Sequence, residues 1–176
     1  MNFLKNIPTW LIVLAFLALS MAVRLLNINS TDIAGDEPFS IFMAQFDVGS
    51  IIKHLGKDNS PPVFEILLHF YVLVFGNSDF TLRLLPTILN ALIVVPIIFI
   101  GQKFFNRTVA ITAALMFVLC IYQIRFAHEI RVYSLFSLAF AWNIFFLLSA
   151  IKKPNHFLVW IALVLTNLLL LYSHYT

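Results

Sequence analysis

Apolar residues in this chain form long runs that are separated by short polar breaks. A helix needs about 20 mostly apolar residues to cross the hydrocarbon core of a bilayer, and five runs come close to that length. They occupy residues 7–26, 84–105, 109–126, 132–151 and 157–172. The pattern therefore predicts an all-α fold, a polytopic transmembrane helix bundle with five spans.

The polar region after the first run has a helical pattern of its own. Its apolar residues recur three and four positions apart in two groups, which is typical of amphipathic helices that lie on a membrane surface. The groups are Phe39, Phe42, Met43 and Phe46, then Val48, Ile51, Ile52 and Leu55. Asp47 and Gly49 mark the expected break between them. We expect residues 28–82 to form one extracytoplasmic loop with these interfacial helices.

Within that loop, residues 63–75 form an apolar stretch that is short for a span. The stretch follows a double proline and is interrupted by Glu65 and His69, four positions apart on one helical face. We interpret these two residues mainly as a polar stripe facing water. The sequence thus predicts an interfacial or re-entrant helix that does not cross the membrane.

The positions of the basic residues predict the topology. The basic residues next to the spans are Lys5, Lys103, Arg107, Lys152 and Lys153. Cytoplasmic loops carry an excess of Lys and Arg, and these five residues share one side only if residues 63–75 do not cross. We therefore expect a multi-pass protein of the cell membrane with a cytoplasmic N-terminus.

Composition agrees with a membrane environment. The chain is 61% hydrophobic and 11% charged with a mean hydropathy of +0.96, whereas about a quarter of the residues in a soluble domain are charged. The formal net charge of +3 is small and the basic residues are scattered, which argues against nucleic acid as a partner. The lipid bilayer is the expected partner. The single cysteine, Cys120, can form no internal disulfide.

The two ends of the chain bear on its organisation. Lys5 before the run at 7–26 resembles the start of a signal peptide, but the run is longer than an ordinary signal core of about 7–15 residues. We expect an uncleaved first span, with cleavage as the alternative. The chain stops at Thr176 as its fifth predicted helix ends. We therefore expect residues 1–176 to be a single transmembrane domain, the N-terminal fragment of a longer multi-span protein.

Carboxylates and arginines gather at the predicted outer face. Asp36 and Glu37 follow the first span, and Asp58 precedes the double proline. Each carboxylate taken alone is typical of helix capping. The other polar residues expected at this face are Arg83, Arg125, Glu129, Arg131 and His174. Since arginines are disfavoured on the outer side of a membrane, the three arginines need an anionic partner, which a phosphate-bearing lipid would supply.

Five motifs follow one another in an order that resembles a known family. They are DE at 36–37, DNSPPVF at 58–64, FGNS with RLLP at 75–86, FAHEIRVY at 126–133 and YSHY at 172–175. In this order they resemble the protein O-mannosyltransferase-like branch of the type C glycosyltransferases. Relatives often have His or Lys directly before the double proline, where this chain has Ser60.

The resemblance implies a multi-helix hexosyltransferase that moves a sugar from a polyprenyl-phosphate donor to a hydroxyl acceptor at the extracytoplasmic face. It implies that Asp36 is the general base and Glu37 its acidic neighbour. The residues expected to bind substrate are Asp58, Arg83, Glu129, Arg131 and His174. The identity of any cofactor stays open, because two carboxylates alone are a weak signature for a divalent metal.

The chemistry of a glycosyl phosphate fits these residue types. The phosphate is a good leaving group, so the reaction mainly needs a base opposite it and positive charge around it. That arrangement implies inversion of the anomeric centre. The alternatives are a non-enzymatic transporter or scaffold bundle, and an inactive truncated transferase that lacks later helices. Asn90, Asn143 and Asn167, which lie within predicted spans, would suit a transport pathway or helix packing.

Overall fold

The computed structural model describes residues 7–30, 32–58 and 60–174, and every regular element in this part of the chain is a helix. The helices are α1 (Thr9–Leu25), α2 (Glu37–Met43), α3 (Val48–Lys57), α4 (Val63–Phe75), α5 (Asp79–Leu92), α6 (Val94–Phe104), α7 (Arg107–Val118), α8 (Ile121–His128), α9 (Tyr133–Lys152) and α10 (Phe157–Leu171). The predicted all-α fold is confirmed. Lys5 of the predicted topology, and Asn59 and Tyr175 of the sequence motifs, lie outside the described residues.

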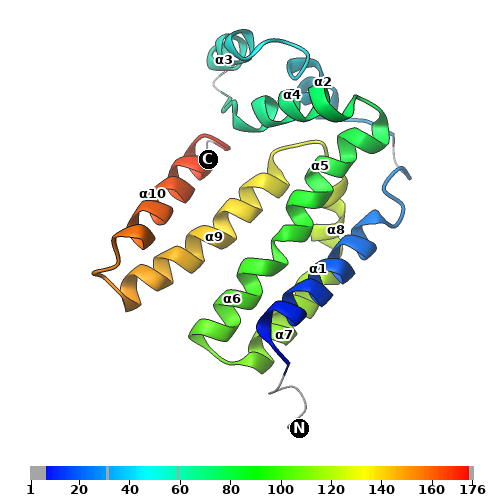
Figure 1. Cartoon of the computed structure of the whole chain (residues 1–176). Coiled ribbons are helices and arrows are strands. Elements are labelled where there is room, and N and C mark those ends of the chain that lie inside the picture. The colour runs from blue at the N-terminus through cyan, green and yellow to red at the C-terminus, as the bar shows by residue number, and fades with distance from the viewer. Residues whose placement is uncertain (1–6, 31, 59, 175–176) are drawn as a thin grey trace.

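α1 and α5–α10 run side by side, and α2, α3 and α4 lie across one end of them (Figure 1). α1 contacts α5, α6 and α7, while α9 contacts α5, α6 and α10. α2, α3 and α4 form a layer over this bundle, near the end of α10 (Figure 1). The turn between α6 and α7 and the turn between α9 and α10 lie at the opposite end (Figure 1).

Two helices in the described part of the chain are long and apolar enough to cross a membrane. They are the 26-residue helix Asp79–Phe104, formed by α5 and α6, and the 20-residue α9. α7 and α8 meet at a bend of 55° and make a third crossing if they are one broken span. α1, α4 and α10 are apolar but shorter. The count of five spans therefore needs α7 and α8 to form one span and needs α1 and α10 to cross as well, which stays a prediction.

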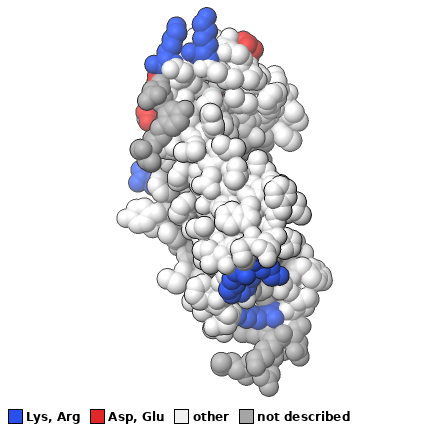
Figure 2. Space-filling model, turned by 90° about the vertical axis from the view of Figure 1, so that its left-hand side faces the viewer, with Lys and Arg blue, Asp and Glu red and all other residues white. Residues whose placement is uncertain are grey.

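Charged side chains are concentrated at the two ends of the molecule. Figure 2 shows a broad zone without Lys, Arg, Asp or Glu across the middle of one face, with basic groups above and below it. Many large apolar side chains on the long helices are exposed, among them Trp10, Leu115 and Val164. Exposure of such apolar side chains to water is unfavourable, whereas contact with the hydrocarbon of a lipid bilayer is not. The chain is thus a membrane protein.

One glycine lets two long helices approach closely. A Cβ atom added at Gly101 of α6 would lie 2.4 Å from the Cα atom of Ala110 in α7. No side chain fits at such a distance, so a glycine is required where α6 turns back into α7. Small residues serve this purpose widely in membrane helix pairs.

The layer formed by α2, α3 and α4 agrees with the periodicity of the sequence. Asp47 caps α3, because its carboxylate accepts a hydrogen bond of 3.1 Å from the backbone N–H of Ser50. Gly49 lies inside α3 rather than at the break. The expectation that Glu65 and His69 face water is wrong for Glu65, and His69 is only partly exposed. Glu65 is buried and accepts a hydrogen bond from Ser40, and the His69 ring lies 2.8 Å from the carbonyl oxygen of Ala44.

Candidate active site

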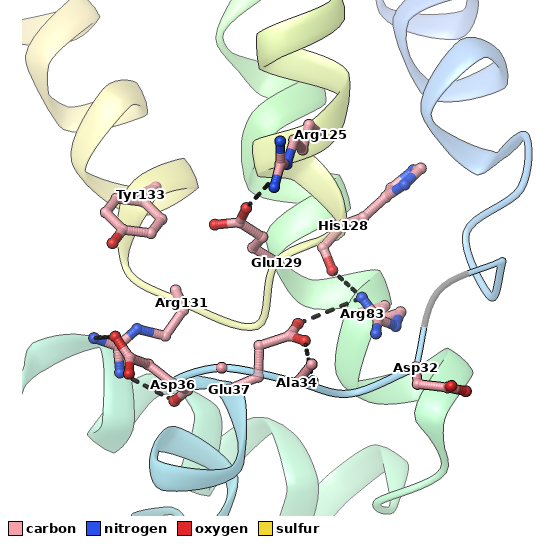
Figure 3. Close-up of a pocket in the computed structure, with 11 residues that line it drawn as sticks. Asp32, Ala34, Asp36, Glu37, Arg83, Arg125, His128, Glu129, Arg131 and Tyr133 are labelled. Atoms are coloured by element: carbon pink, nitrogen blue, oxygen red, sulfur yellow. Dashed lines mark hydrogen bonds and ion pairs between the residues drawn. The ribbon is translucent and has the colours of Figure 1, made fainter.

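A charged pocket of about 380 Å³ lies where the α2–α4 layer meets the bundle (Figure 3). The segment before α2, the first turns of α5 and the connection between α8 and α9 surround it. Its lining residues are Asp32, Ala34, Gly35, Asp36, Glu37, Arg83, Arg125, His128, Glu129, Arg131 and Tyr133. Four carboxylates and three guanidinium groups therefore share one pocket.

Glu37 is the buried member of the acidic pair. One carboxylate oxygen accepts hydrogen bonds from the backbone N–H of Ile130 at 2.9 Å and from the Arg83 guanidinium at 3.4 Å. The other oxygen accepts a bond of 3.1 Å from the backbone N–H of Ala34. Three donors from three segments thus hold this carboxylate. Glu37 joins the first loop, α5 and the loop between α8 and α9.

Arg83 is the cation of this buried pair. Its side chain is only 2% exposed, and it lies one turn inside α5, which Ser78 begins by capping the backbone N–H of Thr81. Besides Glu37, its guanidinium donates a hydrogen bond to the backbone carbonyl of His128. The sequence analysis predicted an anionic partner for this arginine, and that partner is the carboxylate of Glu37.

Asp36 differs from Glu37 in being open to solvent. Its side chain is 79% exposed, and its carboxylate lies 3.7 Å from the Arg131 guanidinium. Although Asp36 occupies the N-cap position of α2, its side chain makes no capping hydrogen bond. Gly35 precedes it with φ of +61°, a conformation that glycine adopts readily. The two neighbouring carboxylates thus point in different directions, as Figure 3 shows.

Arg125 and Glu129 form the opposite wall of the pocket. They are one helical turn apart and their charged atoms lie 3.8 Å from each other. The Arg125 side chain is 80% exposed, which leaves it accessible to a ligand. Burial raises the pKa of Glu129, and the charge of Glu37 acts in the same direction, whereas Arg125 and Arg131 oppose the change.

Arg131 connects the charged pocket to a second, smaller one. Besides Asp36, it donates a hydrogen bond of 3.3 Å to the hydroxyl of Ser40, which donates to Glu65 at 3.1 Å. The second pocket has a volume of about 160 Å³. Its lining residues are Phe39, Ser60, Pro61, Glu65, Arg131, Val132, Ser173 and His174. Arg131 is therefore shared by both pockets.

A buried polar network supports the charged pocket from inside the bundle. Arg24 of α1 is fully buried and donates a hydrogen bond of 2.7 Å to the side chain of Asn90 in α5. Asn90 in turn donates to Gln123 and Ser134. The His128 ring lies 2.6 Å from the backbone carbonyl of Arg24. This network connects α1, α5, α8 and α9 and reaches the pocket at His128.

Most of the residues predicted for the site meet in it. Asp36, Glu37, Arg83, Glu129 and Arg131 all line the charged pocket. His174 lies in the neighbouring pocket, where its ring contacts Phe136. Asp58 is exposed at the C-terminal end of α3 and lines neither pocket. Whether these residues bind substrate stays a prediction.

Sequence reasoning did not single out Asp32 or Arg24. Asp32 is an exposed loop residue with no motif around it, so no pattern in the sequence marks it. Arg24 had a usable signal, because a charge within an apolar run of a membrane protein is costly and tends to be functional or paired. Among residues 7–30, 32–58 and 60–174, no group of three His, Cys, Asp or Glu side chains is arranged to hold a metal ion.

The fold and the pocket define a helical membrane protein with a charged site at one end of its bundle. The family model described as dolichyl-phosphate-mannose-protein mannosyltransferase matches residues 59–175. The chain therefore belongs to this family, as its motifs indicated, and family membership points to glycosyltransferase activity. The matched segment includes Arg83, Glu129 and Arg131 and begins after Asp36 and Glu37. Comparison with curated proteins and comparison with solved structures gave no match.

Proposed function

We propose that this protein transfers a sugar, with mannose as the first candidate, from a polyprenyl-phosphate donor to a hydroxyl acceptor at the extracytoplasmic face. The observation that carries the proposal is the pairing of an exposed carboxylate with guanidinium groups in one pocket. Asp36 is accessible while its neighbour Glu37 is held by three donors. The pocket lies at one end of apolar helices, where the head group of a lipid carrier meets water.

Asp36 acts as the general base in this proposal. A carboxylate oxygen of Asp36 takes the proton of the acceptor hydroxyl while the hydroxyl oxygen forms a bond to the anomeric carbon. The bond between that carbon and the phosphate oxygen breaks, and its electron pair stays on the polyprenyl phosphate. Asp36 then releases the proton to water. A general base of this kind contributes about 10² to 10⁴ in rate.

The arginines stabilise the departing phosphate. Arg125 is the most exposed guanidinium of the pocket, and Arg131 lies beside Asp36. Both are paired with carboxylates at 3.7 to 3.8 Å, which is long for a charge-assisted hydrogen bond of about 2.8 Å. A donor phosphate that forms shorter hydrogen bonds with Arg125 and Arg131 would therefore replace their contacts with the protein carboxylates. Glu37 and Arg83 position the loop that carries Asp36.

Product stereochemistry tests the reaction type. Attack by the acceptor on the face opposite the phosphate inverts the anomeric centre, whereas a covalent sugar–enzyme intermediate would retain it. We expect the protein, expressed from its complete reading frame in liposomes, to convert a β-linked mannosyl phosphate lipid into an α-linked product. Nuclear magnetic resonance of the product measures this directly. A β-linked product would contradict direct displacement, and no transfer from any polyprenyl-phosphate sugar would contradict the proposed function.

Cysteine labelling tests the proposed topology. The scheme puts the pocket outside and the turn between α9 and α10 in the cytoplasm, on the basis of the positive-inside rule. With Cys120 replaced by serine, we expect a cysteine at Lys57 to react with an impermeant maleimide in intact cells. A cysteine at Asn155 should react only after the cells are opened. Both positions are exposed, and equal labelling of both in intact cells would exclude the scheme.

A further inference from the structure

Basic residues also gather at the end of the bundle opposite the charged pocket. Lys103 lies in the last turn of α6, Arg107 begins α7, and Lys152 and Lys153 lie where α9 ends. In Figure 1 these helix ends lie on the side of the bundle away from α2–α4, and Figure 2 shows basic groups below the uncharged zone. We call Lys103, Lys152 and Lys153 the lysine cluster. Lys152 and Lys153 lie close enough to Lys103 for their charges to repel it.

No acidic side chain balances the lysine cluster. All eight Asp and Glu residues of the chain fall at residues 32–79 and at residue 129. Those segments belong to the pocket end, whereas the cluster lies at the other end (Figure 1). Among the described residues, none of the three lysines forms a salt bridge. Charges of one sign held together without a counter-charge favour an external anion.

An aromatic groove lies directly beside these lysines. It has a volume of about 360 Å³ and is lined by Phe99, Gln102, Lys103 and Phe145. The ammonium group of Lys103 lies 4.5 Å from the centre of the Phe145 ring and donates a hydrogen bond of 2.7 Å to Ser149. These contacts hold Lys103 at the mouth of the groove, with its remaining N–H groups available.

Lys152 faces the same aromatic surface from α9. Its ammonium group lies 4.8 Å from the centre of the Phe104 ring, and Lys103 lies 5.4 Å from the centre of that same ring. Two cations on one ring are drawn to the aromatic face but repel each other. An anion between them removes that repulsion. The arrangement thus combines an anion site with an apolar groove in a single ligand-sized region.

We propose that this region binds an anionic phospholipid, with the phosphate on the lysine cluster and an acyl chain along the groove between α6 and α9. Charge complementarity selects an anionic over a zwitterionic head group, since each basic side chain near an anionic lipid surface adds to binding. The groove selects a lipid over a free phosphate ion, because only a lipid fills its apolar walls. The site is separate from the charged pocket, and it does not depend on transferase activity.

Native mass spectrometry of the full-length protein tests this site. The protein is titrated in neutral detergent with phosphatidylglycerol or with phosphatidylcholine of the same acyl chains. We expect phosphatidylglycerol to bind at least tenfold more tightly and to raise the thermal unfolding midpoint. The double variant K152Q/K153Q and the single variant K103Q should each reduce that preference, the double variant by at least tenfold. Equal binding of the two lipids by the unaltered protein would overturn the proposal.

A matched pair of lysines at the opposite end is the control. Lys53 and Lys57 in α3 are exposed as Lys152 and Lys153 are, so K53Q/K57Q removes the same charge from the far end of the molecule. We expect this variant to keep the lipid preference, and an equal loss would show that only total charge matters. Millimolar inorganic phosphate should leave the bound lipid in place. Complete displacement of the bound lipid by phosphate would indicate a site for free phosphate ions and would overturn the lipid assignment.

Discussion

Replacing Asp36 with asparagine is expected to lower the rate of sugar transfer by about 10² to 10⁴ while the protein stays folded. The amide keeps the size of the side chain but has no basic oxygen to accept the acceptor proton. The Asp36 side chain makes no capping hydrogen bond and is largely exposed, so its replacement removes little structure. The assay measures transfer from a polyprenyl-phosphate sugar in liposomes, with thermal unfolding measured in parallel.

Asp79→Asn is the matched control for this experiment. Asp79 is also exposed and lies in the first turn of a helix, but it does not line the charged pocket. We expect that variant to transfer sugar at a nearly normal rate. If Asp36→Asn retained comparable turnover, Asp36 would not be the base. If Asp36→Asn were inactive because it unfolds, the thermal measurement would show it.

Glu37→Gln is expected to act on stability rather than on chemistry. Arg83 is buried against Glu37, and removing one charge of a buried pair typically destabilises a protein by about 3 to 5 kcal/mol. Glutamine also offers only one oxygen acceptor where the carboxylate serves three donors with two oxygens. Equilibrium unfolding in mixed detergent micelles measures the free energy of unfolding.

Glu129→Gln provides the comparison for the buried pair. Glu129 lines the same pocket, but its partner Arg125 is 80% exposed, and exposed ion pairs contribute roughly 0 to 1 kcal/mol. We therefore expect the Glu129 variant to have a free energy of unfolding close to that of the unaltered protein. Equal stabilities for the Glu37 and Glu129 variants would refute the idea that Glu37 holds the pocket together.

Periodicity predicted much of the fold because local spacing determines it. The apolar positions three and four apart correctly predicted helices at α2 and α3, while their place on a membrane surface stays a prediction. The stretch at 63–75 forms a helix with the predicted bounds. The number of crossings was harder to predict, because hydropathy does not indicate that α7 and α8 are bent by 55° or that α10 has only 15 residues.

The sequence indicated most of the charged side chains that line the pocket, but not which carboxylate of the acidic pair is buried. The motif DE does not say which carboxylate turns inward, since that depends on Ile130 and Arg83, far away in the sequence. For the same reason, the sequence did not indicate the partners of the three arginines that were predicted to lie at the outer face. The sequence suggested a lipid phosphate, whereas each of these arginines has a carboxylate of the protein beside it. Long-range pairs of this kind follow from packing.

The bond between Glu37 and the backbone N–H of Ile130 joins residues 93 positions apart. A ribosome makes the chain from the N-terminus, so Glu37 leaves the ribosome well before Ile130 has been synthesised. Until residue 130 has emerged, Glu37 lacks its hydrogen bond from Ile130. Arg83 lacks its bond to the carbonyl of His128 until that residue has been made. The charged pocket is therefore assembled late, after α1 through α8 have been synthesised. A ribosome stalled before that point would hold a membrane-inserted chain whose acidic pair is still accessible to a modifying reagent.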